Sequence, residues 1–176
     1  YTPYLDPFFI SKCAFMVSCQ SGPCSHARAF GRPNLVVNAV YHYSLLPEIN
    51  ELIAFKDYRQ RGSGRSLSVE EIFARNGHLF DRTPHFEQAG WELFDMTAEE
   101  LVAAAEEMIQ QLQQPETSDK LAQQEFRRLM WHFIRNRDIG HPLATPLADY
   151  IGYGVAECRV SEVVAKLRPG YLSVSQ

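Results

Sequence analysis

Two apolar runs, separated by one short helical stretch, constrain the fold of this chain more than any other feature. The first run covers residues 14–19 and the second covers residues 34–40. Short apolar runs bounded by turn residues are typical of strands buried in a parallel sheet. Between the runs, Pro23 stands near the start of the helical stretch and Gly31 stands just past its end. Residues 14–40 are therefore expected to form one β-α-β unit with parallel strands.

The rest of the chain continues this alternation of strands and helices. Residues 51–55 form a third apolar segment that leads to Lys56, and residues 90–95 are expected to form a further short strand. Capping boxes, in which Ser or Thr is followed three residues later by Glu, predict helices that begin at Ser68 and Thr97. The order of elements predicts an α/β fold, a Rossmann-like half whose parallel sheet is flanked by helices, followed by C-terminal helices.

The helix that begins at Thr97 is strongly amphipathic. One face carries apolar side chains expected in the core, and the other is rich in Glu and Gln, with Glu107 among the side chains expected to be solvated. The apolar side chains are Leu101, Ala105, Met108, Ile109 and Leu112. Another helix is expected over residues 119–135. We predict one Rossmann-like domain over residues 1–136, and an irregular tail over residues 137–176 with a short helix that packs on the domain.

Charge, hydropathy and cysteine spacing exclude several classes of function. Lys and Arg number 17 and Asp and Glu 21, a net charge of −4 that argues against nucleic-acid binding by bulk electrostatics. No apolar run approaches the ~20 residues of a membrane span, and the first residues do not resemble a signal peptide, so a soluble, cytoplasmic protein is expected. The spacings predict no metal site; the cysteines are Cys13, Cys19, Cys24 and Cys158.

The loop after the first strand is the expected binding site, because ligands of open parallel sheets lie beyond the carboxyl ends of the strands. Gly22 allows close approach of a ligand, and Ser21 and Ser25 offer hydroxyl groups in the same helical turn as Cys24. The free N–H groups of this turn favour an anion such as a diphosphate. The alternative is that Ser21 and Gly22 only cap the helix and turn the chain. Neither a GxGxxG fingerprint nor a Walker lysine is present.

Other candidate residues follow the later strands. Lys56 ends the third apolar segment, and Asn38 ends the second strand with His42 close behind it. Glu70 lies in the first turn of the helix that begins at Ser68, where it has no capping role to explain it. The arginines on the glycine-containing segment of residues 59–65 are interpreted as a solvated, mobile loop.

These motifs resemble the donor-nucleotide half of GT-B glycosyltransferases over most of the chain. Residues 13–38 are similar to the strand, Thr-Gly-Pro loop and helix of heptosyltransferases. They contain a strand, a Ser-Gly-Pro helix start, the segment Ala-Phe-Gly-Arg-Pro and a second apolar strand. A closer resemblance is to a group of bacterial glycosyltransferases of surface-polysaccharide gene clusters, in Lys56, the Leu-Ser-x-Glu-Glu-Ile helix start of residues 67–72 and the helix of residues 97–108. The tail from Arg159 is similar to the Arg-Ile-Ser ending of that group but lacks the Pro and Phe that follow there.

The resemblance implies a C-terminal domain that binds a nucleotide-sugar donor. Residues 1–136 would then be the nucleotide-sugar-binding domain, needing no cofactor besides the donor. The loop of residues 21–25 would bind the diphosphate and Lys56 would stabilise the leaving group, whereas Glu70 would bind the ribose. Asn38 would contact the sugar or the base.

The same resemblance places the acceptor-binding domain in an N-terminal half that this chain lacks. The first residue is Tyr1 rather than Met, which also indicates a fragment. An isolated donor half is expected to be inactive, and any association with the inner membrane is expected to be peripheral. Two alternatives stay open: a non-catalytic module that binds nucleotides, phosphate or a partner, and half of a nucleotide-sugar 2-epimerase.

Overall fold

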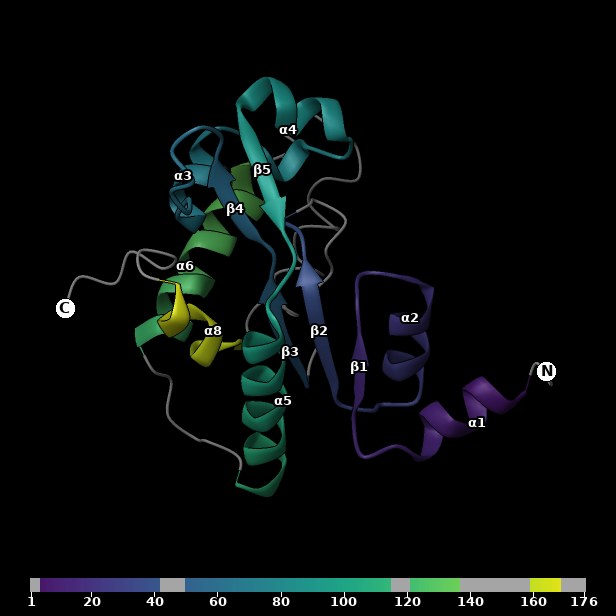
Figure 1. The fold of residues 1–176 in the computed structure, drawn as a ribbon. Coiled ribbons are helices and arrows are strands. Elements are labelled where there is room, and N and C mark those ends of the chain that lie inside the picture. Colours follow the sequence, from purple (N-terminus) through teal and green to yellow (C-terminus); the bar gives the residue numbers. More distant parts are fainter. Residues whose placement is uncertain (1–3, 42–49, 115–120, 137–158, 169–176) are drawn as a thin grey trace.

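The computed structural model describes residues 4–41, 50–114, 121–136 and 159–168 of the 176-residue chain. Its centre is a parallel sheet of four strands in the order β1-β2-β3-β6, flanked by helices (Figure 1). The strands are β1 (Met16–Ser18), β2 (Asn34–Ala39), β3 (Glu51–Phe55) and β6 (Arg159–Val160). Helix α1 (Leu5–Lys12) precedes β1, and α2 (Gly22–Ala29) connects β1 to β2. The expected β-α-β unit with parallel strands is therefore present.

Helices cover both faces of this sheet. Successive residues of each strand point to opposite sides, so neighbouring residues of β2 pack against different helices. On one face, Val36 of β2 belongs to a core cluster with Cys24 of α2 and Phe126 of α6 (Leu121–Asn136). On the other face, Leu35 belongs to a second cluster with Met108 of α5 (Ala98–Gln113). The arrangement is mixed α/β with a parallel sheet, as the sequence predicts.

A second, antiparallel sheet of two strands lies above the first in Figure 1 and consists of β4 (Asp57–Gln60) and β5 (Trp91–Phe94). The chain between them forms α3 (Val69–Ala74), η1 (Gly77–Leu79) and α4 (Thr83–Ala89). The strand predicted near residues 90–95 exists, but it pairs with β4 rather than with the parallel sheet. Strand β4 includes residues expected in the basic loop. The polar sequence of β4 does not predict a strand. The β4–β5 pair is stabilised by the buried rings of Tyr58 and Trp91, whose centroids lie 6.2 Å apart.

Both predicted capping boxes are confirmed. The Ser68 Oγ accepts the Glu71 N–H at 3.1 Å, and the Glu71 carboxylate accepts the Ser68 N–H at 2.9 Å. At the start of α5, Thr97 and Glu100 exchange the same two bonds at 3.2 and 2.8 Å. These caps satisfy N–H groups that would otherwise have no partner in the first turn.

The buried face of α5 is rotated from the expected one. Met108 is buried as predicted, but Ile109 and Leu112 are exposed, whereas Glu100 and Glu107 are buried. Burial of a carboxylate is unfavourable unless hydrogen bonds compensate for it, and the final part of the chain supplies these bonds. A pattern of apolar residues alone would not have revealed this orientation.

The final described segment returns to the edge of the parallel sheet. Strand β6 is too short to predict from its sequence, and α8 (Glu162–Leu167) follows it, as expected for a helix near residues 161–167. The buried side chain of Gln123 in α6 bonds both backbone groups of Val160, at 3.0 and 2.7 Å, so it replaces a neighbouring strand. The division into domains at residue 136 stays a prediction.

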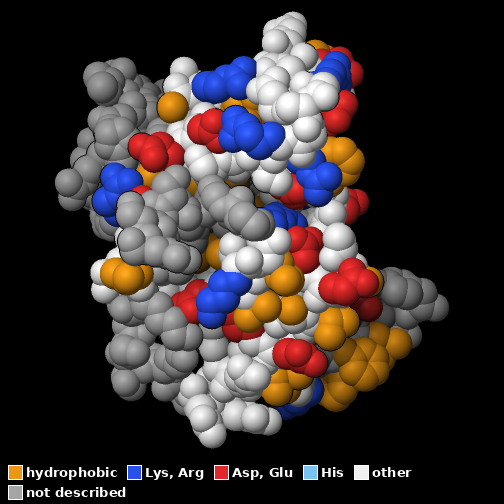
Figure 2. Space-filling view, turned by 60° about the vertical axis from the view of Figure 1, so that its left-hand side comes forward, with side chains coloured by type: hydrophobic (Ala, Val, Ile, Leu, Met, Phe, Trp, Pro, Cys, Tyr) orange, Lys and Arg blue, Asp and Glu red, His pale blue; other side chains and the backbone are white. Residues whose placement is uncertain are grey.

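Hydrophobic side chains lie together on the lower part of the surface, whereas acidic and basic side chains are interspersed over the upper part (Figure 2). Helices α1 and α5 occupy this lower part of Figure 1, and α1 buries none of its residues. Phe8 and Phe9 of α1 and Val102 and Ile109 of α5 are exposed. Within the described ranges, no helix combines the length and the apolar character needed to cross a membrane.

Candidate functional site

The first turn of α2 follows β1 directly and is open to solvent. Ser21 is the N-cap residue, but its side chain does not cap the helix; the Ser21 Oγ donates instead to the Cys19 carbonyl at 3.4 Å. Ser21, Gly22 and Ser25 are all exposed. Pro23 has no N–H group and the Cys24 N–H donates to the Ser21 carbonyl at 3.0 Å, so the Gly22 N–H is the backbone donor of this turn that an anion can bind.

Gly22 leaves open space above this turn. A Cβ atom added at Gly22 would meet no atom within 4 Å, and the φ angle of Gly22 is not left-handed. The fold itself therefore tolerates a side chain here. A substitution at Gly22 would change access to the turn rather than the backbone.

Cys24 belongs to the interior of the same helix and does not extend the exposed turn. The Asn34 Nδ2 donates to the Cys24 Sγ at 3.2 Å and to a Glu51 carboxylate oxygen at 3.0 Å. Ser18 donates to Asn34 at 2.9 Å, and the Arg28 guanidinium binds both oxygens of Glu51 at 3.0 and 3.1 Å. This buried network fixes α2 against the beginnings of β2 and β3. Cys24 therefore helps to hold α2 in place and does not face the solvent where a ligand would bind.

Asn38 joins the end of β2 to the segment before α5. Its backbone is left-handed, with φ of 50°, at the point where the register between β2 and β3 shifts. The Asn38 Oδ1 accepts the Met96 N–H at 2.7 Å, and the Asn38 N–H donates to the Met96 Sδ at 3.5 Å. Asn tolerates this conformation better than most residues, so the side chain and the backbone of Asn38 together determine where α5 begins.

Lys56 lies at the same edge of the sheet, directly after β3. Its N–H donates to the Ala39 carbonyl at 2.8 Å, and its ammonium forms an ion pair with Asp95. The side chain of Lys56 is 27% exposed and that of Asp95 is 68% exposed. The loop before α2 is bonded to the end of β2 through Gln20, whose side-chain oxygen accepts the Val40 N–H at 2.5 Å.

We refer to Gln20, Asn38, Lys56 and Asp95 as the carboxyl-edge cluster. It connects the ends of β1, β2 and β3 with the start of α5, and its member Gln20 directly precedes the exposed turn of α2 in the chain. Asp95 and Gln20 were not predicted as site residues, although an acidic residue just before the Thr97 capping box is a signal that the sequence offers. The cluster combines one ammonium group, which suits an anion, with amide and carboxylate groups, which suit hydroxyls.

The remaining predicted residues lie elsewhere. Glu70 is exposed on α3, on the opposite flank of the molecule from α2 (Figure 1), and its charge contributes to the raised pKa of Arg128 after the larger effect of Glu125. The structure does not bring Glu70 to the α2 turn. His42 lies outside the described residues.

The arginines expected in a solvated loop are ion-paired. Arg59 binds Asp57, Arg61 binds Glu92 at 3.2 Å, and Arg65 binds both oxygens of Glu71 at 2.9 and 2.8 Å. The Arg65 guanidinium lowers the pKa of Glu71 to about 2, with a further contribution from the Ser68 N–H.

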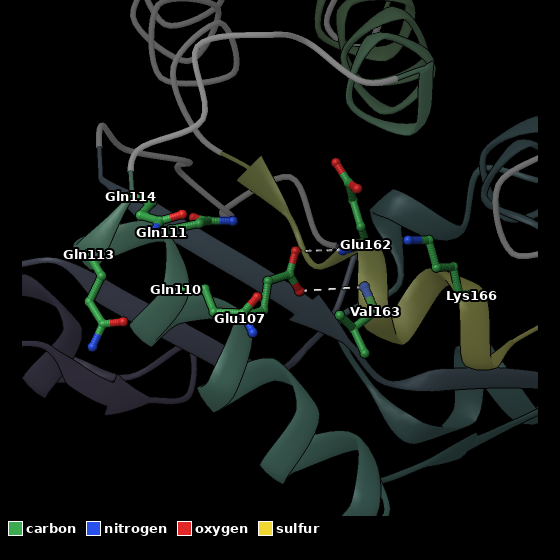
Figure 3. Close-up of a pocket in the computed structure, with 8 residues that line it drawn as sticks. All are labelled: Glu107, Gln110, Gln111, Gln113, Gln114, Glu162, Val163 and Lys166. Carbon is green, nitrogen blue, oxygen red and sulfur yellow. Dashed lines mark hydrogen bonds between the residues drawn. The ribbon is translucent and has the colours of Figure 1, made fainter.

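A pocket of about 450 Å³ lies between α5 and α8 and is lined largely by Gln and Glu side chains (Figure 3). Glu107 accepts the Ser161 hydroxyl at 2.6 Å and the N–H groups of Glu162 and Val163 at 3.1 and 3.4 Å. The first turn of α8 is thus already occupied by a carboxylate of the chain itself. The lining residues on α5 lie about 15 to 25 Å along that helix from its start, at 1.5 Å per residue.

The end of α8 returns to the carboxyl edge through a buried ion pair. Arg168 binds the two oxygens of Glu100 at 2.6 and 2.9 Å and the Phe55 carbonyl at 2.7 Å. Burial alone would raise the pKa of Glu100, but the Arg168 guanidinium and the Thr97 N–H outweigh it and hold this pKa below its ordinary value. This pair fixes the start of α5 against β3, directly beside Lys56.

Comparison of the chain with protein-family models, with curated proteins and with solved structures finds no match. The assignment of a function therefore depends on the site itself.

Proposed function

We propose that this chain is the donor-binding half of a glycosyltransferase and that it binds a nucleotide sugar at the carboxyl edge of its parallel sheet. The observation that carries the proposal is the position of Lys56 at the same edge as the open, uncapped turn of α2. Ligands of parallel α/β sheets bind at this edge. Transfer itself would require an acceptor-binding half as well.

The diphosphate of a nucleotide sugar has matching groups in this arrangement. The Gly22 N–H and the hydroxyls of Ser21 and Ser25 would bind it. Lys56 would neutralise the negative charge that develops on the leaving diphosphate. Electrostatic stabilisation of this kind is usually the largest contribution to lowering the reaction barrier in a site that excludes water. Asn38 would hold the start of α5 and the Lys56 side chain in register with the ligand.

Thermal unfolding in the presence of UDP-, GDP-, CMP- and ADP-sugars tests the proposal. A ligand at 100 times its dissociation constant stabilises a protein by ~2.7 kcal/mol, so at least one of these donors should raise the melting temperature by several degrees. The absence of a shift with every donor would overturn the proposal for this chain.

A pair of substitutions in α2 locates the ligand. Gly22→Leu should abolish the shift because the new side chain occupies the space above the turn, while the added Cβ meets no described atom within 4 Å. The matched control is Ala29→Leu at the exposed, opposite end of the same helix, which should keep the shift. A donor-induced shift that survives Gly22→Leu would show that the donor binds elsewhere.

A further inference from the structure

We propose that Asp95 determines the specificity of this site by selecting ligands that carry hydroxyl groups beside their phosphates. The inference rests on the proposed function and adds a residue to it. The structure supports it through the contacts of Asp95, through the atoms that these contacts leave available, and through the charge of the cluster.

The contacts place Asp95 at the ligand edge. Asp95 follows β5 and immediately precedes Met96, whose N–H is fixed by the Asn38 side chain at 2.7 Å. Its ammonium partner, Lys56, is fixed by the bond from the Lys56 N–H to the Ala39 carbonyl at 2.8 Å. An exposed ion pair contributes little to stability. Replacement of either partner is therefore expected to change ligand binding more than it changes folding.

The atoms of the pair leave hydrogen-bonding capacity on both sides. One carboxylate oxygen of Asp95, Oδ1, accepts from Lys56, and no described residue donates to the other oxygen. The Lys56 ammonium has three N–H donors and gives one of them to Asp95. A ligand can therefore accept from Lys56 through a phosphate oxygen while it donates to Asp95 through a hydroxyl.

The charge of the cluster then sets the preference. Asp95 opposes the attraction of Lys56 for a bare phosphate, because a negative charge beside the ammonium repels a second anion. A hydroxyl group compensates for this repulsion by donating a charge-assisted hydrogen bond to the carboxylate. Discrimination of this kind combines an attractive contact for the correct ligand with a repulsive contact against the wrong one.

The experiment compares Asp95→Asn with the wild-type chain by calorimetric titration of three ligands. These are inorganic pyrophosphate, the nucleotide sugar that gives the largest thermal shift, and the nucleoside diphosphate of that sugar. The matched control is Glu92→Gln, which neutralises an exposed carboxylate of β5, three residues before Asp95, that forms its own ion pair with Arg61. Melting temperatures of both variants without ligand establish that the fold is retained.

Asp95→Asn should weaken binding of the nucleotide sugar by about tenfold, because the hydroxyl then donates to a neutral amide oxygen instead of a carboxylate, and should strengthen binding of pyrophosphate by about threefold. A parallel loss for the nucleoside diphosphate would identify the ribose as the source of the hydroxyl; a gain like that of pyrophosphate would identify the transferred sugar. Glu92→Gln should change none of the three affinities.

Equal losses for all three ligands, or no loss for the nucleotide sugar, would overturn the role of Asp95. These outcomes differ from failure of the proposed function, in which the wild-type chain would bind no nucleotide sugar at all.

Discussion

Among the described residues other than glycine, three have a left-handed backbone conformation, and all three are asparagines. They are Asn38, Asn50 and Asn76. Asn38 lies at the end of β2, and Asn50 precedes β3, where its carbonyl accepts the Asn34 N–H at 3.1 Å. Asparagine adopts this conformation at lower cost than other residues with a Cβ atom. Asn38 thus lies at the end of β2 within the carboxyl-edge cluster, whereas Asn50 lies at the opposite edge of the sheet, just before β3 begins.

Substitutions at Asn38 should separate its two contributions to stability. Asn38→Gly removes the hydrogen bond to the Met96 N–H but suits the backbone, so it should cost about 1 kcal/mol. Asn38→Ala also places an alanine in the left-handed region and should cost about 2 kcal/mol. Urea unfolding measures both values. Equal losses for the two variants would contradict a role of the backbone conformation.

At the scale of elements, α5 organises the second half of the fold through two buried carboxylates. Glu100 in its first turn binds Arg168 at the end of α8, and Glu107 binds the first turn of α8. The two helices therefore run antiparallel, with a fixed offset along their axes. The sequence predicts α5 from its capping box and its period, but it does not reveal these partners, because they lie more than 50 positions away.

Acid should weaken the fold through Glu100. Its folded-state pKa is lowered, so its contribution to the free energy of unfolding is present above its ordinary pKa of 4.5 and is lost as the pH falls below that value. Glu71, with a pKa lowered to about 2, contributes with the same sign between pH 4.5 and pH 2, but its exposure keeps this contribution small.

Glu100→Gln tests this assignment. The variant should lose about 3 kcal/mol at neutral pH, because Arg168 then lacks its charged partner. The free energy of unfolding of the variant should also change less steeply than that of the wild type between pH 5 and pH 3. Glu99→Gln, which alters an exposed neighbour in the same turn, should keep the wild-type slope. An equal slope for Glu100→Gln would show that other groups cause the acid sensitivity.

At the scale of the molecule, the sequence predicts the parallel β-α-β unit, β3 and the capped helices, because local apolar patterns and caps determine them. It does not predict β4 or β6, since buried aromatic neighbours stabilise the first and the Gln123 side chain completes the second. The site shows the same division. Gly22 and Lys56 can be chosen from their positions after strands, whereas Asp95 reaches Lys56 only because β5 pairs with β4, which follows Lys56 in the chain.

In our proposal the carboxyl edge, rather than the pocket between α5 and α8, binds the donor. Amide chemical shifts in ¹⁵N–¹H spectra, followed during titration with the nucleotide sugar of largest thermal shift, test it most directly. The amides of Gly22, Asn38 and Lys56 should move together with one dissociation constant, while those of Gln110 and Gln113, which line the pocket on α5, should stay in place. Shifts confined to Gln110 and Gln113, or no shifts at the carboxyl edge, would contradict this proposal.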